Sequence, residues 1–321
     1  MSHGESHGDG RRAGHGESGG DEASAPARRV GRRTLLRFAA AAGGLALAGA
    51  GAGVAMAEDL LPGGVRLRRA LGLTGPDGSL PPIVPGPVHV ERLRSQARGA
   101  TVQLITMLPP GAARPGDLPV CLALHGRGAD AQTMVDTGLP QFLAEAVAAG
   151  IPPFALVAVD GGDATYWHLT GSDDPQRMLL DEVPGWLAGQ GLRTPAGAMG
   201  ISMGGSGTLR YARNRGARFG PVALLSPALF RDWPAARAVE VFRDEADWRE
   251  HEPLLHLDQP HGSPLGVWCG TEDPFCEAAR GLAARAAQAH FPRGEHDAGF
   301  WRRVMPDTIA FLGNALVGLP A

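Results

Sequence analysis

Apolar residues along this chain gather in short runs that are separated by longer stretches of mixed character. In the first two runs apolar and polar residues alternate with a period of two, which predicts half-buried strands. The later runs are apolar throughout, which is typical of strands buried on both faces of a parallel sheet. The predicted strands are Val88–Leu93, Thr101–Leu108, Leu118–Leu124, Phe154–Val159, Ala196–Ile201, Val222–Leu225, Leu265–Cys269 and a short run near Ala289–Phe291.

The stretches between these runs have the spacing of amphipathic helices. They predict helices at Thr133–Ala149, Gln176–Ala188, Gly207–Asn214, Phe275–Gln288 and Phe300–Val317. Buried strands that alternate with helices predict an α/β fold: a mostly parallel, doubly wound sheet of about eight strands with helices on both faces. The segment Ala228–Ser263 interrupts this alternation with Trp233, Trp248 and many charges, so we expect a short cap-like excursion there.

The N-terminal segment predicts export. Residues 1–30 are rich in Gly, His, Ser and acidic residues without an apolar period, which predicts a disordered polar tail. Arg32-Arg33 then precedes an uncharged, Ala- and Gly-rich stretch, so residues 31–57 resemble a twin-arginine signal read by the twin-arginine translocation machinery. Ala55-Met56-Ala57 matches a cleavage site, and an uncleaved membrane anchor is the alternative.

Beyond that signal we expect a Pro/Gly-rich linker over residues 58–87 and one catalytic domain over residues 88–321. The expected location is extracellular or associated with the cell envelope. Membrane contact is expected only through the N-terminal segment, if it is not cleaved.

Composition excludes several classes of chemistry. All 30 residues of the Lys+Arg total are arginine, which excludes Schiff-base lysines, pyridoxal-phosphate enzymes of the usual lysine type and Gly-Lys-Ser/Thr phosphate loops. A net charge of −3 gives no electrostatic reason to bind nucleic acid. The chain has three cysteines, so at most one internal disulfide can form. Cys269–Cys276 is open as that pair, and Cys121 is expected to be a buried thiol.

The strongest chemical motif follows the predicted strand Ala196–Ile201. Gly200-Ile201-Ser202-Met203-Gly204 has the pattern Gly-x-Ser-x-Gly, which places a serine on a sharp turn from strand to helix. A serine hydroxyl needs a histidine to accept its proton, and the motif requires an acid and then a histidine further along the chain. Ser202 is therefore the candidate nucleophile.

Asp273 and His296 satisfy that order. Asp273 lies just past the predicted strand Leu265–Cys269, with Glu272 and Asp297 as alternatives. Only His290 and His296 follow the acid, and His296 lies in a Gly-bearing loop while His290 falls in a predicted strand. We therefore expect the triad Ser202, Asp273 and His296.

Acyl transfer also needs two donors for an oxyanion. The backbone N–H of Met203, the residue after the nucleophile, is the first candidate. The second is the N–H of Arg127, in the His125-Gly126-Arg127-Gly128 segment after the predicted strand Leu118–Leu124. A plain tight turn is the alternative interpretation of that segment.

These motifs together resemble the putative-esterase family of α/β-hydrolases, which includes feruloyl esterases, esterase D-like enzymes and the mycobacterial antigen 85 mycolyltransferases. The resemblance covers roughly residues 88–316 and is especially similar to exported members from high-GC Gram-positive bacteria. The motifs that carry it are Leu124-His125-Gly126-Arg127-Gly128, Gly200-Ile201-Ser202-Met203-Gly204-Gly205, Ser226-Pro227-Ala228, Gly270-Thr271-Glu272-Asp273 and Gly294-Glu295-His296-Asp297 with Trp301.

The resemblance implies an α/β-hydrolase fold, no cofactor and no metal. It also implies a substrate pocket that includes His125, Trp167 and His168, with the Tyr166-Trp167-His168 segment as its wall and core packing as the alternative for Trp167. Ile201 stands where many members have Trp or His, so the pocket shape is open. We expect a serine esterase acting on a small-molecule ester through an acyl-enzyme. Acyl transfer to an envelope sugar or lipid and a non-catalytic binding protein are the alternatives.

Overall fold

The computed structural model describes residues 69, 72, 74–216, 219–257 and 264–317. The predicted tail, the twin-arginine signal and the first part of the linker lie outside the described residues. The chain divides into two compact units, Met1–Pro62 and Gly63–Ala321, and the fold below is that of the second. Within the described ranges, no helix is both long and apolar enough to cross a membrane.

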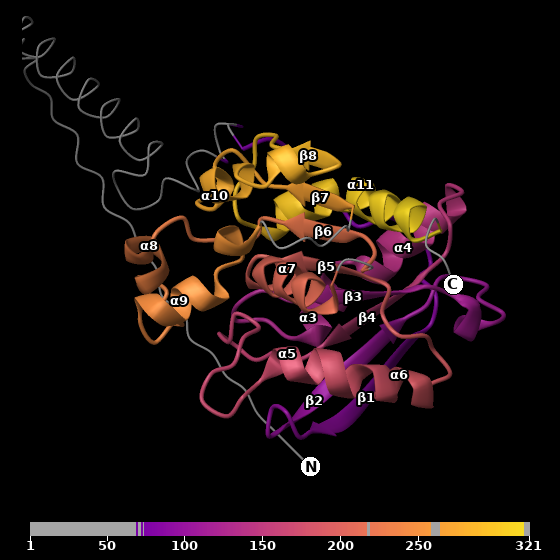
Figure 1. The fold of residues 1–321 in the computed structure, drawn as a ribbon. Coiled ribbons are helices and arrows are strands. Elements are labelled where there is room, and N and C mark those ends of the chain that lie inside the picture. Colours follow the sequence, from indigo (N-terminus) through magenta and orange to yellow (C-terminus); the bar gives the residue numbers. More distant parts are fainter. Residues whose placement is uncertain (1–68, 70–71, 73, 217–218, 258–263, 318–321) are drawn as a thin grey trace, which may run out of the picture. The chain divides into compact units, whose positions relative to one another are not determined.

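One eight-stranded sheet is formed by the described part of the chain, in the order β1-β2-β4-β3-β5-β6-β7-β8 (Figure 1). Strand β2 is antiparallel to both β1 and β4, and every other neighbouring pair is parallel. The strands are β1 Val88–Ser95, β2 Ala100–Met107, β3 Val120–Leu124, β4 Ala155–Val159, β5 Gly197–Ile201, β6 Val222–Leu225, β7 Leu265–Trp268 and β8 Gln288–His290. The predicted mostly parallel sheet is confirmed.

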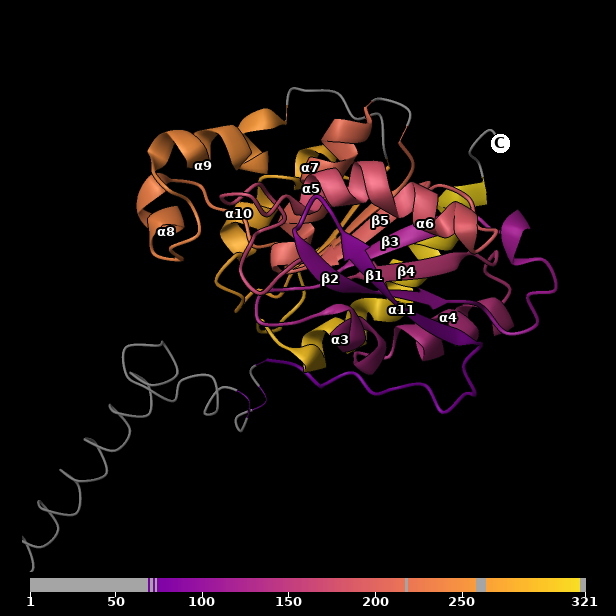
Figure 2. The ribbon, with the colours of Figure 1, turned by 90° about the horizontal axis from the view of Figure 1, so that it is seen from below.

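Helices cover both faces of this sheet (Figure 2). The α-helices whose bounds lie within the described residues are α3 Ala131–Asp136, α4 Leu139–Ala148, α5 Pro175–Arg177, α6 Val183–Gly189, α7 Met203–Arg215, α8 Trp233–Arg237, α9 Glu245–His251, α10 Cys276–Arg280 and α11 Ala298–Val317. Alternate residues of a central strand enter opposite cores: Leu122 packs with the residues of α7, and Cys121 packs with those of α4 and α11. This is why the central strands are apolar throughout.

The helix predicted at Thr133–Ala149 is two helices, α3 and α4. Gly138 separates them with φ 106°, a left-handed conformation that favours glycine, and Pro140 then lies in the first turn of α4. The helix predicted at Phe275–Gln288 was too long. It consists of α10 and a short 3-10 turn at Ala283–Arg285, and Gln288 already belongs to β8.

Two other helices differ in detail. α5 and α6 are joined by a π-helical turn at Met178–Glu182, so the predicted segment Gln176–Ala188 is helical but not uniform. α7 begins at Met203, four residues before the predicted start at Gly207.

The end of the predicted linker is docked on the catalytic unit. The Arg303 side chain on α11 donates to the carbonyl of Pro76 at 2.8 Å, and Gly78 N–H donates to the carbonyl of Gly299 at 2.8 Å. Leu108 N–H donates to the carbonyl of Pro87 at 2.9 Å. Residues 74–87 therefore belong structurally to the domain that follows them.

The excursion after β6 contains α8, α9 and a 3-10 turn at Pro253–His256; residues 258–263 of the predicted segment lie outside the described residues. The rings of Trp233 and Trp248 pack 6.4 Å apart, and Trp248 and Phe242 join the core on the α7 side of the sheet. This excursion contributes Val239 to the pocket described next.

Candidate active site

Ser202 lies at the turn between β5 and α7 with φ 56° and ψ −119°, a conformation that side-chain-bearing residues rarely adopt. The glycines around it are required sterically. A Cβ on Gly200 would come within 2.1 Å of the Gly204 carbonyl oxygen, and one on Gly204 within 2.0 Å of the Leu124 oxygen. The Gly-x-Ser-x-Gly pattern therefore lets α7 begin directly against β3 and β5, with the serine at the apex.

Three side chains from distant parts of the chain meet at this turn. Nε2 of His296 lies 2.8 Å from Oγ of Ser202, and Nδ1 of His296 lies 2.8 Å from Oδ2 of Asp273. His296 comes from the loop before α11, and Asp273 from the loop after β7. A carboxylate only accepts, so Nδ1 of His296 carries the proton and Nε2 is free to accept from the Ser202 hydroxyl.

The carboxyl of Asp273 is held in its charged form. Its side chain is fully buried, and that burial acts to raise its pKa. Hydrogen bonds from His296, from Ser226 and from the Phe275 N–H outweigh the burial, so the pKa of Asp273 is lowered from its usual value. The ionised carboxylate is the form that can orient the imidazole.

Ser226 and Trp301 support the pair formed by His296 and Asp273. Trp301 Nε1 donates to Oγ of Ser226 at 3.1 Å, and the Trp301 ring meets the His296 imidazole edge to face at 5.3 Å. Phe275 makes a similar edge-to-face contact with His296 at 5.2 Å. The histidine is therefore fixed by two rings as well as by Asp273.

A cavity of about 470 Å³ opens onto Ser202 and His296. It is lined by Gly126, Arg127, Gly128, Ala129, Thr133, Met134, Thr137, Asp163, Tyr166, Ile201, Ser202, Val239, Phe275, His296 and Trp301. Most of these side chains are apolar or uncharged, and Arg127 and Asp163 are the charged exceptions besides the histidine. Tyr166 lies at the pocket wall, as the sequence predicts, whereas the sequence does not predict Val239, Met134 and Phe275 as pocket residues.

The segment after β3 packs closely on the nucleophile. A Cβ on Gly126 would lie 3.3 Å from Cβ of Ser202, so a glycine keeps the loop backbone near the hydroxyl. The Arg127 side chain turns away toward the excursion, where Nη1 donates to the carbonyl of Val239 at 3.2 Å. Met203 is the first residue of α7, and its backbone N–H therefore has no partner within the helix.

The expectation that His125, Trp167 and His168 line the pocket is wrong. All three are buried, and the cavity wall is formed by the neighbouring Tyr166 instead. His125 Nε2 accepts from the Gly161 N–H at 2.8 Å, and Trp167 Nε1 donates to the His125 carbonyl at 3.1 Å. These contacts brace the loops behind the site, which is the core-packing alternative for Trp167.

His168 faces the excursion rather than the pocket. Its ring stacks on Phe242 at 5.2 Å and on His251 at 4.6 Å. Burial, with the nearby cationic Arg210 and the neighbouring His251, lowers the pKa of His168 to about 3, so its imidazole is neutral.

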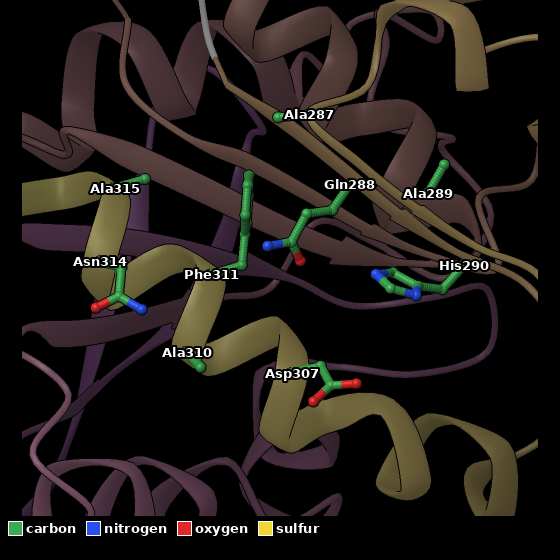
Figure 3. Close-up of a pocket in the computed structure, with 9 residues that line it drawn as sticks. All are labelled: Ala287, Gln288, Ala289, His290, Asp307, Ala310, Phe311, Asn314 and Ala315. Atoms are coloured by element: carbon green, nitrogen blue, oxygen red, sulfur yellow. The ribbon is translucent and has the colours of Figure 1, made fainter.

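The competing acids and histidine have other partners. Glu272 accepts from the Gly294 N–H at 2.6 Å, and Asp297 accepts from the Phe300 N–H and from Arg69, which places it at the start of α11. His290 lies on β8 at a different hollow of about 800 Å³, between β8 and α11 (Figure 3). Ser202 is not among the residues lining that hollow.

The three cysteines are free thiols and all are buried, including Cys269 and Cys276, which the sequence left open as a pair. Burial raises the pKa of the Cys121 and Cys269 thiols. A buried thiol of raised pKa is a poor nucleophile, so the described cysteines do not compete with Ser202.

Comparison with known proteins identifies the family of the chain. The model of the Esterase family ("Putative esterase") matches residues 95–308. No curated protein matches the chain.

Several solved structures resemble the fold. A ferulic acid esterase superposes with a TM-score of 0.60 at 16% identity, covering 71% of this chain and 97% of its own. An S-formylglutathione hydrolase from Agrobacterium tumefaciens gives 0.59 at 18% identity, covering 74% and 98%. MPT51 (FbpC1) of Mycobacterium tuberculosis gives 0.57 at 20% identity, covering 72% and 99%.

At these identities the superpositions establish the α/β-hydrolase fold alone, which confirms the fold expected from the sequence. The family model supplies the activity, because it spans most of the domain, from the end of β1 into α11. The chain therefore belongs to the Esterase family and is an ester hydrolase built on the α/β-hydrolase fold.

Proposed function

We propose that this esterase is a serine hydrolase that cleaves small carboxylic esters through an acyl-enzyme, with Ser202 as nucleophile, His296 as general base and Asp273 as the orienting acid. One observation carries the proposal. Hydrogen bonds link Asp273 to His296 and His296 to Ser202, and Ser202 lies in the wall of an apolar cavity, where its hydroxyl can meet a carbonyl carbon.

The steps follow from the hydrogen bonds. Ser202 Oγ attacks the ester carbonyl while its proton passes to Nε2 of His296. Asp273 accepts from Nδ1–H throughout and stabilises the imidazolium that forms. His296 then gives the proton to the leaving alcohol, and water attacks the acyl-enzyme by the same path in reverse.

The oxyanion of each tetrahedral intermediate is stabilised by the backbone N–H groups of Met203 and Arg127. Two features support this assignment. Met203 opens the 13-residue helix α7, whose N-terminus favours negative charge, and Arg127 lines the cavity beside Gly126. The proposed chemistry is complete without a metal ion or organic cofactor.

Substitution of the nucleophile and the base tests the proposal. With short p-nitrophenyl esters, Ser202→Ala and His296→Ala are each expected to lower kcat by about 10⁴-fold or more. A fluorophosphonate probe is expected to label the wild type and not Ser202→Ala. Wild-type turnover in both variants would sink the assignment, and a wild type that neither turns over esters nor takes up the probe would make the chain a binding protein on this scaffold.

Acyl transfer uses the same three residues and differs only in the acceptor. Product analysis with trehalose or glycerol present separates the two outcomes: free acid indicates hydrolysis, and an acylated sugar or glycerol indicates transfer.

Export by the twin-arginine route is a further part of the proposal. It is supported by Arg32-Arg33 and the uncharged stretch that follows, which lie outside the described residues. Expression in a host with an active twin-arginine pathway is expected to deliver the protein outside the cytoplasm, and Arg32→Lys with Arg33→Lys to retain it inside. Equal export of both forms would contradict this route.

A further inference from the structure

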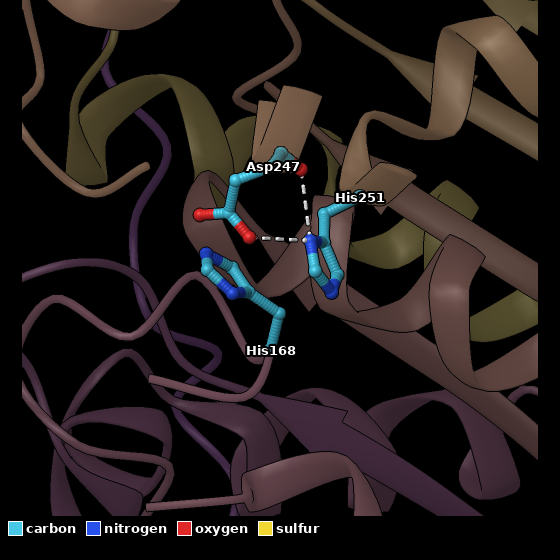
Figure 4. A group of neighbouring side chains, drawn as sticks. All are labelled: His168, Asp247 and His251. Carbon is cyan, nitrogen blue, oxygen red and sulfur yellow. Dashed lines mark hydrogen bonds and ion pairs between the residues drawn. The ribbon is translucent and has the colours of Figure 1, made fainter. Parts of the chain in front are cut away.

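A second group of chemically active side chains lies behind the pocket wall, apart from the triad. His168 follows the pocket residue Tyr166, and Asp247 and His251 lie one turn apart on α9. One possible ligand atom from each of the three lies within 4.8 Å of the other two, and Figure 4 shows the two rings beside the carboxylate. None of the three lines the catalytic cavity.

Each histidine offers one ring nitrogen to the group. Nδ1 of His168 lies 3.0 Å from the carbonyl oxygen of Leu169, so it carries the proton and its Nε2 keeps a lone pair. Metal-binding histidines are commonly oriented in this way, by donation from the other ring nitrogen to a carbonyl. In His251, Nδ1 is the nitrogen beside Asp247, 2.8 Å from its carbonyl oxygen and 3.1 Å from Oδ1 (Figure 4), so a bound metal ion would take the place of the Nδ1 proton.

The lone pair on Nε2 of His168 accepts no hydrogen bond from the described residues. The residue is only 1% exposed, yet its Nε2 has no hydrogen-bond partner there. A buried acceptor without a partner costs free energy, and native structures rarely keep one without a reason. Figure 4 shows the His168 ring turned toward the Asp247 carboxylate, which cannot donate to it while ionised.

Asp247 forms an ion pair with Arg243 and has room for a further bond. Oδ1 faces Arg243 Nη2 and His251 Nδ1, each at 3.1 Å, while Oδ2 accepts from the Arg243 N–H at 2.9 Å. Two carboxylate oxygens offer about four lone pairs, so one remains free.

We propose that His168, Asp247 and His251 form a binding site for a divalent transition-metal ion, best matched by Zn²⁺, that ties α9 to the Tyr166–His168 segment. Two imidazole nitrogens and one carboxylate oxygen are zinc ligands, and water completes the four. Tetrahedral zinc with bonds of 2.0–2.1 Å sets its ligands about 3.3 Å apart, so the rings and the carboxylate close inward on the ion.

The positive charge of the buried Arg210 opposes the binding of a metal cation at this site. Its guanidinium donates to the carbonyl of Tyr166 at 2.6 Å and also to that of His251, so it already joins the two segments that the ion would join. The site is thus preformed by Arg210, with repulsion that lowers the affinity for the ion.

Titration with Co²⁺, a coloured substitute for Zn²⁺, tests the site directly. The full chain carries His3, His7 and His15 in its tail, so the experiment uses a background with those three changed to asparagine. That protein is expected to bind one equivalent of Co²⁺ with visible d–d bands and to release it to Zn²⁺. Zinc at a hundredfold excess over its Kd is expected to raise Tm by roughly 5 °C or more.

Two ligand variants and one control decide the location. His168→Asn and His251→Gln are expected to weaken Co²⁺ binding by more than about 100-fold, beyond the loss typical of an outer partner. His256→Ala is the control, since this half-buried histidine lies on the same excursion and its Nε2 bonds to the Arg249 carbonyl. It is expected to bind Co²⁺ as the parent does.

The proposal is overturned if the parent binds no stoichiometric Co²⁺, or if His168→Asn binds it unchanged. Where a variant does not fold, zinc X-ray absorption on the parent decides: two imidazoles with oxygen support the site, and any other shell overturns it. Fluorophosphonate labelling of Ser202 is expected to persist after chelation, because the ion lies outside the cavity. Failure of this site therefore leaves the proposed catalytic function intact.

Discussion

At the scale of single residues, the role that a histidine can play depends on which of its two ring nitrogens carries the proton. In His296 the partner of Nδ1 is a carboxylate, and Nε2 faces the hydroxyl of Ser202. In His168 the partner is a carbonyl, and Nε2 faces no donor among the described residues. The first arrangement suits a general base and the second suits a metal ligand.

Sequence order was enough to find His296 but not to place His168. The triad order restricts a base to positions after the acid, and only two histidines satisfy that. The direction of the His168 side chain depends on packing against Phe242 and His251, which lie more than seventy residues further along the chain. No local pattern encodes such a contact, so the pocket expectation failed there.

Asp273→Asn is expected to distinguish the catalytic acid from Asp297, the carboxylate next to His296 in the sequence. An asparagine can present its amide to His296 and favour the wrong tautomer, so kcat is expected to fall by about 10⁴-fold with little change in KM. Asp297→Asn is the matched control, since asparagine also caps helices and Asp297 caps α11. Steady-state kinetics on both variants tests this, and equal losses would contradict the assignment of Asp273.

At the scale of elements, buried strands were predictable and helix starts were not. The run Val222–Leu225 matches β6 at both ends, because a strand buried on both faces must be apolar at every position. α7 begins four residues before its predicted start, because Met203, Gly204 and Gly205 carry no amphipathic signal. Its start is set instead by the close approach to β3 and β5.

Gly204→Ala is expected to disrupt that approach. The new Cβ would meet the backbone oxygen of Leu124 at 2.0 Å, and a backbone atom of a central strand cannot yield cheaply. We expect a loss of about 3 kcal/mol or more in the free energy of unfolding and a fall in Tm of roughly 6–12 °C.

Gly185→Ala on α6 is the control for the helix-forming effect of alanine. Gly185 is exposed and its added Cβ would meet nothing within 4 Å, so a gain of about 0.5–1 kcal/mol is expected. Thermal unfolding of the two variants measures the difference. Similar Tm values for both variants would show that the start of α7 does not require a residue without Cβ at position 204.

At the scale of the whole molecule, the sheet places the site and the excursion shapes it. Parallel strands β5 and β7 bring Ser202 and Asp273 to the same edge of the sheet, as expected for this fold class. The alternation of runs predicted that edge. It could not predict that Val239 completes the pocket, because the position of this residue depends on how the excursion packs on the core.

The excursion also carries a buried acid, and we expect its titration to make the stability of the whole fold depend on pH. Glu252 is fully buried and accepts from the N–H groups of Phe230 and Leu254. Burial raises its pKa from 4.5 to about 7, against those bonds and the nearby Arg210. The folded chain therefore keeps a proton between pH 4.5 and 7 that the unfolded chain releases.

Stability is accordingly expected to fall as pH rises from 4.5 to 7, by about 3 kcal/mol, equivalent to a Tm decline of roughly 6–12 °C. Glu252→Gln cannot ionise, so it is expected to flatten the decline, whereas Glu250→Gln on the exposed side of the same excursion keeps it. Calorimetry of the three proteins across this pH range measures the slopes. A wild-type Tm that rises steadily over the range, or an unchanged slope in Glu252→Gln, would mean that Glu252 is ionised in the folded protein and that Arg210 with the two N–H donors outweighs its burial.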